Sequence, residues 1–214
     1  GATGNTYQTP VLNQSVSYWV QVGNGVNSSN STTATLMVGP QVATPVFSPN
    51  GGAFAANTTQ SVSLSCPTPG ASIFYKLGTS SQYIAYTGAF NITSNNSAQA
   101  YATATNHVQS AYASASFLFY TTAPKILGNS TLQSSVNYGY STSFFVFASN
   151  ASLYQWYQGA SGDTSTLLAS STTQSSLTTP PVLGATNYWV RVSNPIGNID
   201  SPTFTAASYP VPVV

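Results

Sequence analysis

The amino-acid sequence predicts an all-β protein built from antiparallel β-sandwiches in tandem. Apolar residues nowhere follow the i, i+3, i+4, i+7 spacing of an amphipathic helix, while Ser, Thr, Asn, Gly and β-branched residues dominate. Short runs with a two-residue alternation recur instead, and Gly, Asn and Pro separate them. Many short strands between such turns are typical of sandwiches and barrels.

An internal repeat organises these strands along the chain. Residues 9–24 recur at 179–194, and a Ser/Thr-rich strand follows each copy. Pro40 and Pro124 mark the joints, because proline favours extended linkers. The clearest alternating runs are 61–66, 73–76, 98–105, 143–148, 153–157 and 188–192.

The C-terminal part of the chain resembles a prokaryotic immunoglobulin-like repeat. The resemblance rests on LYQWYQG at 153–159, SSLTT at 175–179 and YWVRVSNPIG at 188–197. It implies an immunoglobulin-like sandwich over residues 122–214, with Trp156 as the core tryptophan of strand C. It also implies that residues 1–40 are the C-terminal half of such a module, with strands E, F and G only. The disulfide cysteines of antibody domains are absent.

The middle of the chain, residues 44–121, resembles the immunoglobulin-like module at the C-terminus of chitobiase and β-hexosaminidase. The matching residues are PVFSPNGG at 45–52, ASIFYK at 71–76, YTGAFNI at 86–92 and AQAYA at 98–102. In that family the module is an accessory sandwich and not the catalytic domain. The predicted domains are therefore residues 1–40, 41–121 and 122–214.

Charge is nearly missing from this sequence. Only 2% of the residues are charged and the formal net charge is +1, whereas about 25% is usual in soluble domains. Nucleic acids and anionic membranes need clustered Lys and Arg, so neither is an expected partner. No apolar run has the length of a membrane-spanning helix. A near-neutral surface favours self-association, and the expected partner is the protein itself.

The residues that carry catalysis or bind metals are too few and too scattered for a site. Glutamate is absent, and Asp163 and Asp200 lie in turn sequences, where Asp is favoured for local hydrogen bonds. His107 has no carboxylate in its module to orient it, and Cys66 is the only cysteine and is expected to act as a small buried hydrophobe. We therefore expect no enzyme activity, no cofactor and no metal site.

The aromatic residues, at 13% of the chain, are the richest resource for contacts. Alternation on strand F turns Tyr188, Val190 and Val192 inward, and likewise Tyr18, Val20 and Val22. The same alternation turns Trp19 and Trp189 outward. Each outward tryptophan has three explanations: a neighbouring strand covers it, another module or subunit buries it, or it stacks on a sugar ring. Candidate contacts between modules or subunits are Trp19, Trp189, Tyr18, Val20 and Val22.

Asparagine in the N-glycosylation pattern Asn-X-Ser/Thr occurs eight times. Glycans at these sites would supply hydration that charge does not, whereas the pattern is meaningless in an ordinary bacterial product. The candidate acceptors are Asn13, Asn27, Asn30, Asn57, Asn91, Asn95, Asn129 and Asn150.

The half-module leads to the expected function. Half a sandwich exposes its inner face and an unpaired edge, so either upstream residues or another chain must supply the missing strands. The sequence therefore favours an extracellular structural protein: a subunit or repeat segment of a cell-surface filament, adhesin stalk or surface layer, with donor-strand complementation between pilus-like subunits as one mode of assembly. The alternative is a non-catalytic, carbohydrate-contacting region of a secreted glycoside hydrolase.

Overall fold

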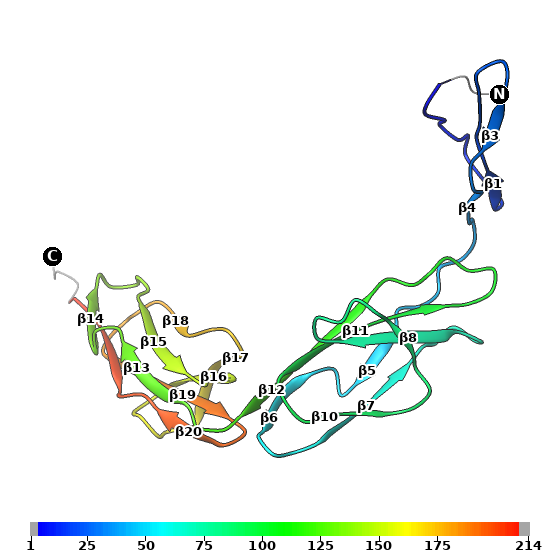
Figure 1. Cartoon of the computed structure of the whole chain (residues 1–214). Coiled ribbons are helices and arrows are strands. Elements are labelled where there is room, and N and C mark those ends of the chain that lie inside the picture. The colour runs from blue at the N-terminus through cyan, green and yellow to red at the C-terminus, as the bar shows by residue number, and fades with distance from the viewer. Residues whose placement is uncertain (1–3, 210–214) are drawn as a thin grey trace. The chain divides into compact units, whose positions relative to one another are not determined.

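The computed structural model describes residues 4–209, and every regular element in that range is a β-strand (Figure 1). The predicted all-β class is therefore confirmed. Each of the six alternating runs named above overlaps a strand, and only 61–66 and 98–105 extend one or two residues past the end of theirs. The chain groups into two compact units: residues 4–51, 60–92 and 96–116 form the first, and residues 52–59, 93–95 and 117–209 form the second.

The first strands of the chain form one antiparallel hairpin. β1 (Val16–Tyr18) pairs with β4 (Ala34–Leu36), and β2 (Gln21–Gly23) pairs with β3 (Ser28–Asn30). We call residues 16–36 the N-terminal hairpin. Among the described residues, no third strand pairs with it.

The middle strands form two sheets, in the orders β5-β7-β10 and β6-β12-β11-β8-β9. Inward residues of the two sheets meet, because the ring of Tyr75 on β8 stacks on Phe90 of β10 with 4.3 Å between centroids. The strands are β5 (Val46–Ser48), β6 (Gly52–Ala55), β7 (Gln60–Ser65), β8 (Ser72–Leu77), β9 (Ile84–Ala85), β10 (Phe90–Ile92), β11 (Asn96–Thr103) and β12 (Ala113–Tyr120).

The C-terminal strands also form two sheets, β13-β15-β18 and β14-β21-β19-β16-β17, with β20 paired to β19. We call this sandwich the C-terminal module. Its strands are β13 (Lys125–Asn129), β14 (Gln133–Val136), β15 (Ser143–Ser149), β16 (Leu153–Gln158), β17 (Thr166–Ser171), β18 (Ser176–Thr178), β19 (Thr186–Asn194), β20 (Gly197–Asp200) and β21 (Phe204–Ser208).

The two sandwiches share one strand order. In each, the second strand pairs in parallel with the last, as β6 does with β12 and β14 with β21, while the other ladders are antiparallel. This is the order A′-G-F-C-C′ facing A-B-E of immunoglobulin-like domains. The chain is thus a tandem of immunoglobulin-like sandwiches, as predicted. The domain boundaries after residues 40 and 121 remain predictions.

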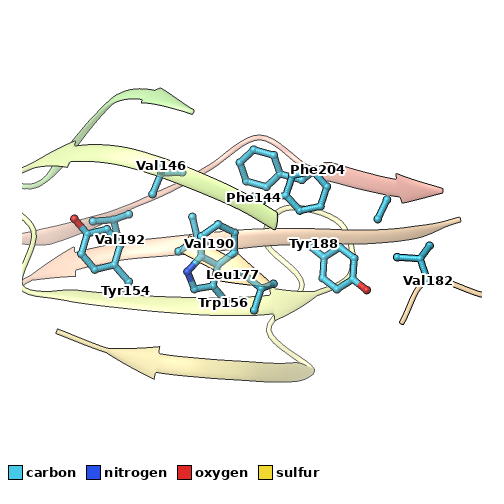
Figure 2. Packing of buried hydrophobic residues seen from close by; sticks show 11 residues of the cluster. Phe144, Val146, Tyr154, Trp156, Leu177, Val182, Tyr188, Val190, Val192 and Phe204 are labelled. Atoms are coloured by element: carbon cyan, nitrogen blue, oxygen red, sulfur yellow. The ribbon is translucent and has the colours of Figure 1, made fainter. Parts of the chain in front are cut away.

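Alternating side chains build the core of the C-terminal module. Figure 2 shows Phe144 and Val146 of β15 facing Trp156 of β16 and Val190 of β19. All four side chains have no exposed surface, so burial of apolar area is what holds the two sheets together. The prediction that Trp156 is the core tryptophan is confirmed. Its indole N–H also donates to the carbonyl oxygen of Gln174, at 3.3 Å.

Candidate assembly site

The N-terminal hairpin repeats the last hairpin of the C-terminal module in register, at a constant offset of 170 residues. Tyr18 pairs with Ala34, and Tyr188 pairs with Phe204. Further along, Gln21 pairs with Asn30 as Arg191 pairs with Asp200. The sequence repeat is therefore also a structural repeat, and β1–β2 correspond to β19, while β3–β4 correspond to β20–β21.

The two hairpins also share side-chain hydrogen bonds. The Val20 N–H donates to Oγ of Ser31 at 3.0 Å and its carbonyl accepts the Ser31 N–H at 2.8 Å. Val190 makes both contacts with Ser201, each at 2.9 Å. In each copy this serine occupies the bend between the two G-strand segments. Because it bonds one residue on the other side of the hairpin, it joins the two sides at the same place in both copies.

The turn of each hairpin is stabilised by the same asparagine. Oδ1 of Asn24 accepts the N–H groups of Val26 and Asn27, at 3.0 and 2.9 Å. Oδ1 of Asn194 accepts those of the residues two and three further on, at 2.8 and 3.2 Å. Such asparagine turns tighten a hairpin locally, so the two copies share the same turn.

The contacts around the two hairpins differ completely. In the C-terminal module β16 pairs with the side of β19 that faces away from β20 and β21, and Trp156 lies opposite Val190. Val190 and Val192 are fully buried there, whereas their counterparts Val20 and Val22 are 52% and 68% exposed. No residue between 4 and 40 is buried. At Val20 and Val22 the inner face of the N-terminal hairpin is therefore uncovered in the described part of the chain, whereas the ring of Tyr7 lies 5.6 Å from that of Tyr18.

The predicted strand E of the half-module does not form. Residues 6–8 lie 170 positions before β18 and are its counterpart in the repeat, but they belong to no strand. The reason is physical: β18 pairs only with β15, and no counterpart of β15 exists within residues 4–40. The described hairpin thus contains strands F and G alone.

Of the two outward tryptophans, only Trp19 is exposed, at 58%, whereas Trp189 has no exposed surface. The Trp189 ring stacks on Tyr157 of the neighbouring strand, and its Nε1–H donates to the carbonyl oxygen of Asp163 at 2.9 Å. The prediction that Trp189 contacts another module or subunit is therefore wrong. A neighbouring strand covers it, which was one of the three explanations.

A second candidate surface lies on the outer face of the sheet that contains β8 and β11. Phe74, Tyr83, Tyr101 and Tyr112 form what we call the tyrosine cluster. Tyr101 stacks on Phe74 at 5.3 Å and meets Tyr83 and Tyr112 edge-on at 4.9 and 5.6 Å. Tyr112 is 54% exposed. This cluster is not among the predicted sites, although the order Ala100-Tyr101-Ala102 signals it, with small buried residues on either side of one outward ring.

Polar groups accompany the tyrosine cluster. The Tyr83 hydroxyl donates to Oε1 of Gln99, and Nζ of Lys76 lies 5.1 Å from the Tyr83 ring centroid. Gln99 and Lys76 face each other across the ladder of β11 and β8. Desolvation raises the pKa of Tyr83 first, with smaller contributions from Tyr112 and Tyr101. The cluster therefore presents rings, hydroxyls, an amide and one cation.

All eight candidate N-glycosylation asparagines lie on exposed positions. Asn57 and Asn150 adopt left-handed backbone angles, at φ of 62° and 55°, as turn residues do. The presence of glycans at these positions remains a prediction.

Each carboxylate and the one histidine has its own partner in the described chain. Asp163 accepts the N–H of Ser165, which lowers the pKa of its carboxyl. Asp200 binds Arg191 through two contacts of 2.7 and 2.8 Å. His107 binds the carbonyl of Thr105. Within residues 4–209, no three His, Cys, Asp or Glu side chains group as a metal site. The described range also holds no helix of the length and apolarity needed to cross a membrane.

Cys66 is less buried than the sequence predicts. Its side chain is half-buried and not fully buried, and its Sγ lies 3.2 Å from the carbonyl oxygen of Ala43. The residue follows β7, where the strand leaves the core. It is a free thiol in the described chain.

Comparisons with known proteins find similarity among solved structures only. A scan against protein-family models finds no match, and a search of curated proteins finds none. Similar solved structures include a chimeric titin Z1Z2-Z1Z2 tandem, at 14% identity and a TM-score of 0.34, covering 78% of this chain and 100% of that one. Sidekick-1 immunoglobulin domains 1–5 match at 13% identity and 0.35, covering 94% and 46%. The four N-terminal immunoglobulin domains of a Dscam1 isoform match at 12% and 0.36, covering 83% and 51%. The chain thus spans about half the length of the last two.

Proposed function

We propose that this chain is an extracellular structural protein, a subunit or repeat segment of a cell-surface filament, adhesin stalk or surface layer. The observation that supports it best concerns the N-terminal hairpin. Its strands pair in the same register as the last hairpin of the C-terminal module, but its Val20 and Val22 are uncovered. A hairpin of this kind is stable as part of a sandwich, so it calls for strands from elsewhere. A contact that joins one end of a unit to the next does not close on itself and generates a filament.

The composition supports the same proposal. The five charged side chains leave hydration to Ser, Thr, Asn, Gln and Tyr, and a near-neutral surface does not repel its copies. Eight exposed glycosylation sequences would add hydration outside the cell. Deglycosylation of the native protein should lower its apparent mass if these asparagines carry glycans.

Electron microscopy tests the proposal directly. Negatively stained protein from its native source should show polymers or long rods with a repeat of one sandwich. Isolated particles of one or two sandwiches, unchanged by raising the concentration, would contradict a structural assembly.

The tyrosine cluster favours one alternative, a carbohydrate-contacting region of a secreted glycoside hydrolase. Tyrosine rings pack against the C–H faces of sugars, while hydroxyl and amide groups bind sugar hydroxyls. The test is a pull-down with insoluble cellulose and chitin. Tyr112→Ala should abolish retention, while Phe147→Ala, which removes a 63% exposed ring of the C-terminal module, should not. Equal retention of both variants would remove this alternative.

A further inference from the structure

We infer that the free edge of β1–β2 is an acceptor for an extended segment with the aromatic alternation of β16, held in the register that β16 takes on β19. This inference rests on the proposed function, because it names the partner that completes the module. The occupant is defined by its chemistry: an aromatic residue opposite Val20, another opposite Val22, and a third on the outer face against Trp19.

The backbone of the hairpin presents the groups that such a strand needs. Val20 directs both its N–H and its carbonyl toward Ser31. Successive residues of a strand point their backbone groups to opposite sides, so Trp19 and Gln21 present theirs to the free edge. Their counterparts Trp189 and Arg191 lie on β19, whose corresponding side pairs with β16.

The register follows from the closed copy. Trp156 stands opposite Val190, Tyr154 opposite Val192, and Tyr157 opposite Trp189. Subtracting the offset places the same three aromatic positions opposite Val20, Val22 and Trp19. A slip of one residue would turn every aromatic side chain to the wrong face, so the pattern admits a single register.

The inner face adds a requirement of shape. Phe204 is fully buried and stacks on Phe144 at 5.0 Å, whereas Ala34 stands at its place in the N-terminal hairpin. The bulk reappears one inward position further on, where Leu36 replaces Ala206. The side chains that pack on the inner face must therefore be large where they contact Ala34 and small where they contact Leu36.

Charge places no demand on the occupant. Gln21 and Asn30 take the positions of Arg191 and Asp200, the ion pair of the closed copy. The acceptor edge is therefore neutral, and a neutral, aromatic-alternating strand fits it better than a charged one. Strand β16 of the same chain has this composition, which makes it a usable probe.

The experiment adds a synthetic peptide of residues 152–159 to the full chain and follows amide exchange by NMR. Slower exchange at Trp19 and Gln21, saturating with peptide, is the expected result. A peptide with Tyr154→Ser and Trp156→Ser is the first control and should leave the exchange unchanged. Val20→Asp should abolish the protection. Val46→Asp alters a valine of matched exposure, 53% against 52%, and should not affect it.

Three results would overturn the inference: no protection by the peptide, protection that survives Val20→Asp, or edge amides already protected because two hairpins pair in a dimer. Its failure is separable from that of the proposed function. Polymers by microscopy without peptide binding would reject the acceptor register alone. Peptide binding by a protein that forms no assembly or tandem array would reject the structural role alone.

Discussion

The indole of Trp189 lies stacked on the phenol ring of Tyr157, with 4.7 Å between centroids and 14° between ring planes. Both residues are on the outer face of the sheet, yet both are buried. The guanidinium of Arg191 lies 5.3 Å from the centroid of the Trp189 ring and adds a cation–π contact to the pair. A second small apolar layer therefore exists outside the core of the C-terminal module, and the N-terminal hairpin has only its tryptophan.

This layer predicts that Trp189→Ala destabilises the C-terminal module about as much as Trp156→Ala, by about 3–5 kcal/mol, because each deletes a buried aromatic ring. Urea unfolding of the full chain measures the loss. Trp19→Ala is the matched control, since the same residue type stands at the equivalent position but is exposed, and it should change the unfolding midpoint little. A cost for Trp189→Ala as small as that of Trp19→Ala would mean that the outer layer contributes no stability.

The sequence predicts which way each side chain of strand F points, but not which residues cover it. Alternation correctly turned Val190 and Val192 inward and Trp189 to the other side. The cover of Trp189 comes from Tyr157 and from the carbonyl of Asp163, both far away along the chain. A register shift in the pairing of β16 with β17 between Trp156 and Tyr157 accompanies this arrangement, and no local pattern announces such a shift. The tyrosine cluster was missed for a related reason, because its four rings come from four separate segments: β8, the loop before β9, β11 and the loop before β12.

The ion pair between Arg191 and Asp200 should contribute little. Both side chains are over a quarter exposed, and exposed pairs are worth about 0.2–1 kcal/mol. The double variant Arg191→Gln with Asp200→Asn recreates the pair found at Gln21 and Asn30. A double-mutant cycle by urea unfolding should give a coupling in that range at low salt, reduced at high salt. A coupling of several kcal/mol, insensitive to salt, would contradict the prediction.

Gly51 is required by a close approach as well as by its backbone angle. Its φ is +74°, and an added Cβ would lie 2.4 Å from the carbonyl oxygen of Ser116. Gly70 has nearly the same angle, +70°, but open space around it. Gly70→Ala should therefore cost only the left-handed strain of about 1–2 kcal/mol. Gly51→Ala should cost clearly more, as the shift of the thermal midpoint will show. Equal shifts would mean that the strand beside Gly51 yields freely.

Stability should change little with acid and fall with base. Burial raises the pKa of Tyr154 and of Tyr188 above the usual 10.0. A raised pKa in the folded state means that their contribution is complete below about pH 10 and is lost as the pH rises through the folded value. Asp163 has a lowered pKa, so its contribution is lost only as the pH falls through that lower value, and its exposure keeps the contribution small.

Thermal melts at about pH 3 and about pH 7 should therefore agree within a few degrees, whereas melts above about pH 10 should fall steeply. Tyrosinate absorbance measured alongside should show two groups that ionise only as the module unfolds. A large loss of stability at acid pH would contradict this prediction, because the sequence holds only two Asp, no Glu and one His.

Amide hydrogen exchange of the full chain, without any peptide, tests most directly whether the N-terminal hairpin is an open copy of a closed one. We expect rapid exchange at Trp19 and Gln21 and slow exchange, limited by unfolding of the C-terminal module, at Trp189 and Arg191. Val20 and Val190, whose N–H groups bond to a serine in both copies, should differ less. Equal protection of Trp19 and Trp189 in the monomeric chain would show that the hairpin edge is already covered and would contradict the account.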